Sequence, residues 1–208
     1  MQKIETKQKI LTKALELFSE RGYDAVSVDE IAKAVGIKAP SLYNHFPSKK
    51  AIFLAIVESI QSQYDEDTDQ IDIHVGDAKK DIPQFEETSF ETLFEKVRQM
   101  FLYSLHNQTI SRFRRMMTIE QFRSQELGSL YSKQYVDCLL RYHADIFRSL
   151  IKNDEIANED PEALALMYVA PIALLIGVCD RNPEKEQECL KKLHSHVELF
   201  FRMVHRKK

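Results

Sequence analysis

The chain is poor in the residues that interrupt regular structure or cross-link small folds. It has only 5 Gly and 6 Pro in 208 residues, which argues against a loop-rich all-β fold and against extensive disorder. Its 3 Cys are odd in number and show no paired spacing, which excludes a disulfide framework and a zinc finger. The first ten residues lack the apolar core of a signal peptide, so we expect a cytoplasmic protein.

The chain also has little excess charge of either sign. Its formal net charge is −3, as in many soluble globular proteins. Residues 1–50 nevertheless contain nine Lys or Arg against six Asp or Glu, so this end carries +3 and the remainder −6. A basic end on an acidic body favours a polyanionic partner for that end, although an ordinary solvated face could have the same composition.

Long apolar runs are scarce as well. The longest uncharged run covers residues 163–179, and a membrane span needs about 20 apolar residues. Acidic residues precede this run, Asp180 and Arg181 follow it, and Pro171 lies inside it. We therefore expect a central helix shared between the core and a subunit interface, and no membrane contact.

Apolar residues recur at helical spacing along almost the whole chain, which predicts an all-α fold. Residues 65–87 differ, because they combine nine acidic residues with Gly76 and Pro83, and they are expected to form an acidic connection or a frayed helix end. No strand is expected. The predicted helices lie at about 10–21, 28–35, 39–46, 48–64, 90–106, 109–123, 126–152, 161–179 and 184–206.

Residues 27–47 contain the clearest functional pattern. Ser27 and Glu30 form a capping-box sequence that predicts a helix start near Val28. Gly36 ends this helix, and a second short helix follows from about Ala39, with Pro40 in its first turn. This order is typical of a helix-turn-helix, which presents its second helix to the DNA major groove. A helical hairpin with no DNA role would have the same pattern.

The facing of the second helix follows from a rotation of about 100° per residue. Leu42 and Phe46 then point inward together with Ala39, whereas Pro40, Ser41 and Asn44 point outward. Asn44 can pair with adenine and Ser41 with several bases. Groups suited to phosphate lie on the flanks or at the helix N-termini near Val28 and Lys49. The flanking phosphate candidates are Lys38, Tyr43, His45 and Lys49.

Residues 9–57 resemble the DNA-binding domain of the TetR/AcrR family of bacterial regulators. The resemblance rests on F-x-x-x-G-Y (residues 18–23), S-V-D-E-I-A (27–32) and S-L-Y-N-H-F-x-S-K (41–49). It implies a helix-turn-helix domain at 1–47 and a ligand-binding and dimerisation domain at 48–208. The implied DNA contacts are Ser27, Val28, Lys38, Ala39, Ser41, Tyr43, Asn44, His45 and Lys49. Pro40, which belongs to the outer face, departs from the small or polar residue common there.

The resemblance further implies a homodimeric repressor that binds a palindromic operator in double-stranded DNA and leaves it when a small-molecule effector binds. The two last predicted helices are the expected dimer surface. Large adaptable side chains of the second half are candidates for lining an effector pocket, and core packing is the alternative for each of them. These candidates are Tyr103, Phe113, Met116, Met117, Tyr131, Tyr135, His143 and Tyr168.

No signature of catalysis or metal binding stands out. The chain lacks G-x-S-x-G, P-loop and H-E-x-x-H motifs, and His194 and His196 diverge by about 200° on a helix. We therefore expect no enzyme activity, no cofactor and no metal site. Two other functions stay open at this point, namely a DNA-binding regulator or activator without an effector, and a helical protein-interaction bundle or enzyme.

Overall fold

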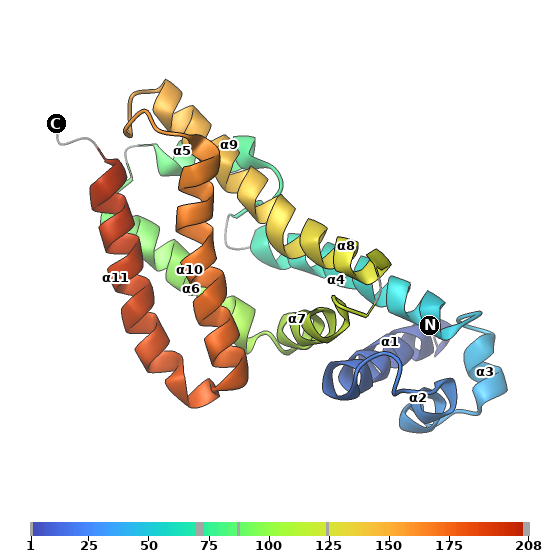
Figure 1. The fold of residues 1–208 in the computed structure, drawn as a ribbon. Coiled ribbons are helices and arrows are strands. Elements are labelled where there is room, and N and C mark those ends of the chain that lie inside the picture. Colours follow the sequence, from blue (N-terminus) through green and yellow to red (C-terminus); the bar gives the residue numbers. More distant parts are fainter. Residues whose placement is uncertain (1, 70–72, 87, 124, 206–208) are drawn as a thin grey trace. The chain divides into compact units, whose positions relative to one another are not determined.

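The computed structural model describes residues 2–69, 73–86, 88–123 and 125–205, and its regular elements are helices throughout (Figure 1). Among the described residues, β-structure is limited to one isolated bridge between Ile156 and His205. The predicted all-α fold is confirmed. The α-helices are α1 (Gln2–Arg21), α2 (Val28–Val35), α3 (Ala39–Tyr43), α4 (Lys49–Asp69), α5 (Ala78–Phe85), α6 (Phe90–His106), α7 (Gln108–Glu120), α8 (Gln125–Ser132), α9 (Cys138–Lys152), α10 (Pro161–Arg181) and α11 (Glu186–Val204).

The chain packs as two compact units. Unit 1 is Met1–Glu66 with Gln108–Tyr131, and unit 2 is Asp67–Asn107 with Ser132–Lys208. Unit 1 therefore contains α7, which packs against α1 although it lies far along the sequence. This division by packing differs from the functional boundary predicted after residue 47, which stays a prediction.

Local sequence signals account for the turns around α2. The Ser27 hydroxyl accepts a hydrogen bond from the Glu30 backbone N–H at 3.2 Å, and the Glu30 carboxylate accepts one from the Ser27 N–H at 2.8 Å. Gly36 ends the helix with φ +84°, a conformation that glycine adopts without steric cost. The capping box and the glycine stop are confirmed.

The short helix α3 ends earlier than predicted, at Tyr43 rather than at Phe46. The backbone nevertheless stays turned, because the N–H of Phe46 still donates to Leu42 O at 3.0 Å. Pro47 follows directly and has no N–H with which to continue the pattern.

The core of unit 1 joins α1, α4 and α7. Phe18, Tyr23 and Phe53 form an aromatic cluster with ring centroids 5.3–6.3 Å apart. On α7, Phe113, Met116 and Met117 are almost completely buried. The apolar face of α7 therefore belongs to the core of this unit.

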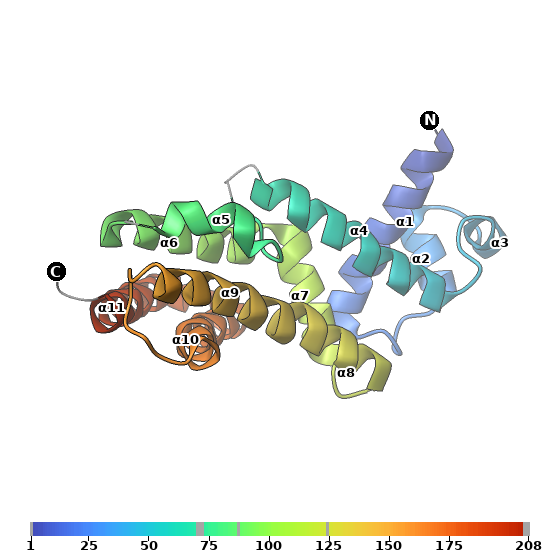
Figure 2. The ribbon, with the colours of Figure 1, turned by 90° about the horizontal axis from the view of Figure 1, so that it is seen from above.

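Unit 2 is a bundle in which α9 lies between α5 and α10 (Figure 2). Its buried side chains form two clusters. One joins α5, α9, α10 and α11, and the other joins α6, α10 and α11. A single π-helical turn, Lys133–Asp137, precedes α9, so the predicted helix at 126–152 is present as α8, this turn and α9.

Residues 65–87 are more ordered than the sequence pattern predicted. Helix α4 continues to Asp69, and α5 occupies 78–85, while residues 70–72 and 87 lie outside the described range. The prediction of an acidic connection was wrong for α5 because one of its acids is not solvated. Asp81 is 1% exposed and accepts hydrogen bonds from the His74 N–H at 2.7 Å and from the Tyr142 hydroxyl.

The His74 imidazole bridges two of these acids. Its Nδ1 lies 2.5 Å from Asp81 Oδ1, and its Nε2 lies 2.9 Å from Asp69 Oδ1. The hydrogen bond to Asp81 raises the pKa of His74 above its ordinary value of 6.5, although burial opposes the shift. A raised folded-state pKa stabilises the fold fully below the unfolded pKa, and this contribution is lost as pH rises through the folded pKa.

We expect His74→Gln to destabilise the protein by roughly 1 kcal/mol at pH 5.5, as for one hydrogen bond, and by less at pH 8.5. Urea unfolding at both pH values measures this difference. His194→Gln, at a half-exposed histidine of α11, is the matched control for the loss of an imidazole. An equal loss for His74→Gln at both pH values would contradict the assignment.

Candidate nucleic-acid interface

The outer face of α3 is made of small and polar side chains. Leu42 is 0% exposed and Phe46 is 4% exposed, which confirms the predicted inner side. Tyr43 is 51% exposed on the flank. A helix with this pattern can approach a groove closely, because nothing bulky stands between its backbone and the base edges. The exposed side chains of this segment are Lys38, Pro40, Ser41, Tyr43 and Asn44.

The remaining candidates near α3 are less accessible. Ala39 and His45 are partly buried. Ser27 is exposed, but its N–H and its hydroxyl are both engaged with Glu30. The hydrogen bond from the Ser27 backbone, assisted by Arg21 at 2.8 Å, lowers the pKa of Glu30 to about 2, so this carboxylate is charged at neutral pH. At the start of α2, the backbone around the partly buried Val28 is therefore a better phosphate donor than the Ser27 side chain.

Lys49 points toward the fold. Its ammonium donates to Tyr23 O and to Val26 O, both at 2.9 Å, and lies 4.3 Å from the centre of the Tyr23 ring. An ammonium has three N–H donors, and two are used here. The third N–H remains for the predicted phosphate contact.

The loop Tyr23–Val26, which precedes α2, is held from three helices. Lys49 of α4 binds two of its carbonyls, and Arg21 of α1 donates to Ala25 O at 2.8 Å. From α7, the Glu120 carboxylate accepts the Tyr23 N–H at 2.8 Å and a bond from Arg123 at 3.3 Å. Glu120 is 1% exposed, so these bonds satisfy a buried charge. We call this arrangement the loop clamp.

Gly22 leaves room for the side chains of Glu120 and Arg123 next to the loop Tyr23–Val26. Its φ is +82°, and a Cβ at this position would lie 2.9 Å from Arg123 Nη1 and 3.0 Å from Glu120 Oε1. Glu120 was not among the residues singled out from the sequence. No local pattern marks Glu120, because its partner lies 97 positions away.

The structure distributes the eight ligand candidates over both units. Phe113, Met116 and Met117 are core residues of unit 1, and Tyr131 lies on α8. In unit 2, the Tyr103 hydroxyl donates to Asp67 at 2.8 Å, and Tyr135 lies in the π-helical turn. Among these candidates, His143 and Tyr168 line a common cavity in the described part of the chain.

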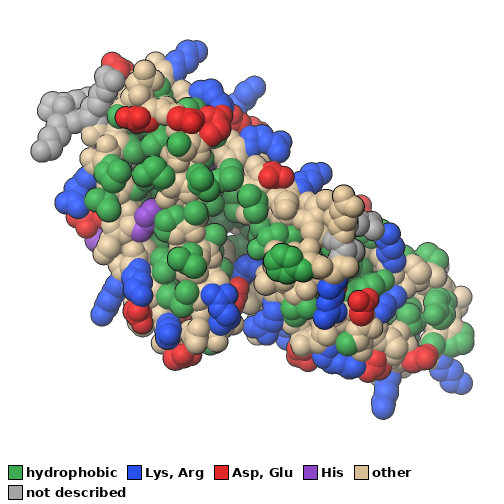
Figure 3. All heavy atoms as spheres, in the orientation of Figure 1, with side chains coloured by type: hydrophobic (Ala, Val, Ile, Leu, Met, Phe, Trp, Pro, Cys, Tyr) green, Lys and Arg blue, Asp and Glu red, His purple; other side chains and the backbone are tan. Residues whose placement is uncertain are grey.

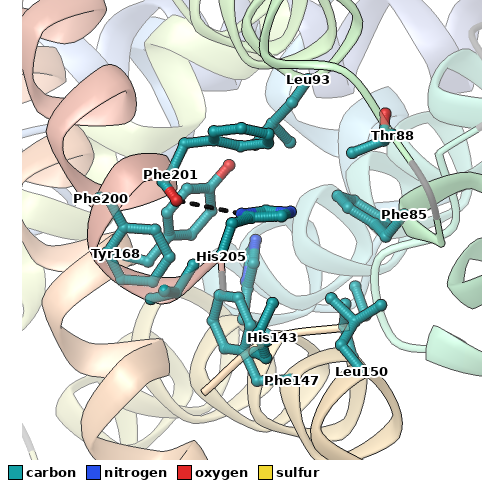
Figure 4. A pocket seen from close by; sticks show the side chains of 13 residues that line it. Phe85, Thr88, Leu93, His143, Phe147, Leu150, Tyr168, Phe200, Phe201 and His205 are labelled. Atoms are coloured by element: carbon teal, nitrogen blue, oxygen red, sulfur yellow. Dashed lines mark hydrogen bonds between the residues drawn. The ribbon is translucent and has the colours of Figure 1, made fainter. Parts of the chain in front are cut away.

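This cavity lies inside unit 2, among α9, α10, α11 and the connection from α5 to α6 (Figure 4). Its volume is about 30 Å³, which is room for a few water molecules. Aromatic side chains form much of its wall, among them Phe85, Phe147 and Phe201. Among the described residues, no group of three His, Cys, Asp or Glu side chains could hold a metal ion.

Unit 2 also exposes an apolar face over α10 and α11 (Figure 3). Its members are each about half exposed or more, which is unusual for such large apolar side chains. Helix α10 is long and apolar enough to span a bilayer, with a mean hydropathy of 2.1, and 33% of that window is buried. This exposed apolar face consists of Leu166, Met167, Leu174, Leu199 and Met203.

Comparison with known proteins points to one family. A model described as bacterial regulatory proteins, tetR family, matches residues 10–56. IcaR, the negative transcriptional regulator of the biofilm operon icaADBC in Staphylococcus aureus (strain Newman), is 31% identical over 136 residues, which are 62% of this chain and 72% of the relative.

Solved structures share the fold over nearly the whole chain. A TetR-family protein from Mesorhizobium loti superimposes with a TM-score of 0.71 at 19% identity, covering 99% of this chain and 100% of that one. SmeT, a repressor from Stenotrophomonas maltophilia, superimposes in its triclosan complex with a TM-score of 0.71 at 16% identity, covering 98% and 93%. At these identities the likeness supports the fold alone.

Proposed function

The chain belongs to the TetR family of DNA-binding transcriptional regulators, which are not enzymes, and from this premise we propose that it is a homodimeric cytoplasmic repressor released from a palindromic operator by a small molecule. The observation that carries the proposal is the outer face of α3, where Leu42 and Phe46 are buried while Ser41, Tyr43 and Asn44 face outward. The names of the relatives IcaR and SmeT describe repressors, which supports the sign of regulation.

In the proposed complex α3 lies in the major groove. Asn44 and Ser41 read base edges, because their short side chains extend from the outer face. Tyr43, Lys38 and His45 contact phosphates on the flanks, and the N–H groups at the start of α2 add a further phosphate contact. Ala39 and Pro40 provide the close approach of the backbone.

The exposed apolar face of α10 and α11 is proposed as the dimer interface. Large side chains such as Leu174 are exposed, in this case to 64%, and covering them with a second copy lowers the free energy of the assembly. Two-fold symmetry then places two α3 helices about 34 Å apart, or a multiple of this distance, on one face of the duplex. We favour a second copy over a bilayer as the partner of this face, because charged residues lie at both ends of α10.

Two features support effector release. Unit 2 contains a cavity, and the loop clamp connects α4 and α7 to the loop before α2. SmeT has been solved with a bound small molecule, triclosan. In this chain α4 continues from unit 1 into unit 2, and α7 follows α6 directly, so both helices can transmit a change in unit 2 to the loop before α2. An effector that prefers a different arrangement would shift the population away from the DNA-binding form.

A regulator without an effector is the second candidate. The small volume of the cavity, about 30 Å³, favours it, because cavities for drug-sized ligands are usually about 300 Å³ or larger. Screening compounds for release of a bound operator separates the two candidates.

Selection of bound fragments from random DNA tests the main proposal and identifies the operator. With that operator, we expect Tyr43→Ala to weaken binding about tenfold, the loss of one hydrogen bond to a charged group, without lowering stability. Tyr43→Phe is the matched variant that removes only the hydroxyl. Undiminished binding by both variants in a gel shift would refute the contact.

Asn44→Ala should change sequence preference more than general affinity. A contact to a base determines which sequence is bound, whereas a contact to a phosphate positions the protein on the duplex. The same fragment selection on this variant is the measurement. Selection of an unchanged operator would contradict the base contact.

A further inference from the structure

The cavity of unit 2 has no charged wall. None of the 13 residues that line it is Lys, Arg, Asp or Glu, and most are aliphatic or aromatic. An ionised ligand buried there would lose its hydration without gaining a counter-charge, which is strongly unfavourable. The cavity therefore selects uncharged molecules.

The polar side chains of the wall are Thr88, His143, Tyr168 and His205, and the rings of His143 and Tyr168 lie 5.1 Å apart between centroids. Tyr168 is 5% exposed, and among the described residues no hydrogen bond engages its hydroxyl. In Figure 4 this hydroxyl points among the lining side chains, near Phe201 and His205. Burial raises the pKa of Tyr168, so the hydroxyl keeps its proton and can donate or accept.

The imidazole of His143 is a second polar group of this wall. Its Nδ1 lies 2.9 Å from Leu139 O, and a carbonyl only accepts, so Nδ1 carries the proton and Nε2 has a lone pair. Burial lowers the pKa of His143 to about 4, so the ring is neutral at pH 7. The rings of His143 and Tyr168 are 5.1 Å apart between centroids, so both side chains border the same part of the cavity.

We propose that this cavity binds a small uncharged aromatic molecule bearing one hydroxyl group, a phenol in chemical class. The ring lies among Phe147, Phe201 and their neighbours, where aromatic side chains pack in tilted and edge-on pairs. The ligand hydroxyl donates to His143 Nε2 and accepts from the Tyr168 hydroxyl.

The cavity is smaller than such a ligand in this structure. A protein cavity of about 150 Å³ accommodates benzene, whereas this one measures about 30 Å³, so its walls must move apart on binding. Binding therefore favours a second conformation of unit 2. That this molecule is also the effector rests on the proposed function, whereas binding itself does not.

Phenol, toluene and benzoate are the probes, tested on the full chain without DNA by calorimetric titration and thermal unfolding. We expect phenol to bind and to raise Tm, and benzoate to bind at least tenfold more weakly because its charge is not compensated. Tyr168→Phe should weaken phenol binding about fivefold, as for the loss of one neutral hydrogen bond. It should change the affinity for toluene less than about twofold.

Tyr142→Phe is the matched control, because Tyr142 is a buried tyrosine of the same unit whose hydroxyl donates to Asp81. It should lower stability and leave phenol affinity unchanged. The inference is overturned if phenol does not bind, if benzoate binds equally well, or if Tyr142→Phe weakens phenol as much as Tyr168→Phe does. Phenol binding without any effect on operator affinity supports the site and counts against the proposed release mechanism alone.

Discussion

Leu174→Glu should separate the proposed dimer into monomers of 24.3 kDa and reduce operator affinity at least 100-fold. Leu174 lies on the exposed apolar face of α10 and is 64% exposed. A carboxylate there would be desolvated in a dimer interface but remains hydrated in the monomer. Each α3 would then bind one half-site alone, without the high local concentration that the partner subunit provides.

Sedimentation equilibrium measures the mass, and titration of a two-half-site duplex measures the affinity. Leu54→Glu, at a leucine of α4 that is 42% exposed outside this face, is the matched control for the mass. A wild-type chain that sediments as a monomer, or that partitions into membranes, would contradict the proposed interface. So would a Leu174→Glu chain that remains a dimer.

The second large effect is expected at the loop clamp. Lys49→Met keeps the length of the side chain but removes two hydrogen bonds to the carbonyls of Tyr23 and Val26. We expect a loss of about 2 kcal/mol in the free energy of unfolding, as for hydrogen bonds of a charged group. Operator affinity should fall at least tenfold, because the loop sets the position of α2 and of the α3 that follows.

Lys50→Met is the matched control, since it removes the same charge from the neighbouring exposed position. A phosphate contact contributes about one unit to the slope of log affinity against log salt. Lys49→Met should lower the urea midpoint and leave this slope nearly unchanged. A lower slope with unchanged stability would show that Lys49 contacts a phosphate.

The local part of this fold could be predicted from the sequence. Ser27 and Glu30 are three residues apart and cap one helix, and Gly36 and Pro47 act on their own backbone. The inward facing of Leu42 and Phe46 follows from helix geometry alone. Such features depend on neighbours within a few residues, so the sequence pattern contains the information needed.

The long-range part could not be predicted in the same way. The apolar face of α7 has the same pattern whether it borders a ligand cavity or packs on α1, so the sequence could not show that Phe113, Met116 and Met117 are buried in the core of unit 1. The burial of Asp81 could not be predicted either, because it depends on the Tyr142 hydroxyl, which lies 61 positions away on α9. His143 and Tyr168 meet only because α9 and α10 pack together.

Unit 1 consists of two separate stretches of the chain, which limits how the protein can be cut into fragments. A fragment cut after Glu66 would retain all the side chains proposed to contact DNA, yet it would lack α7 and leave the covered face of α1 open to water. It would also lack Glu120, the acceptor of the Tyr23 N–H. We therefore expect the smallest piece that folds around the proposed recognition helix α3 to be discontinuous, and chimaeras that graft α3 onto another body to need residues 108–131 as well.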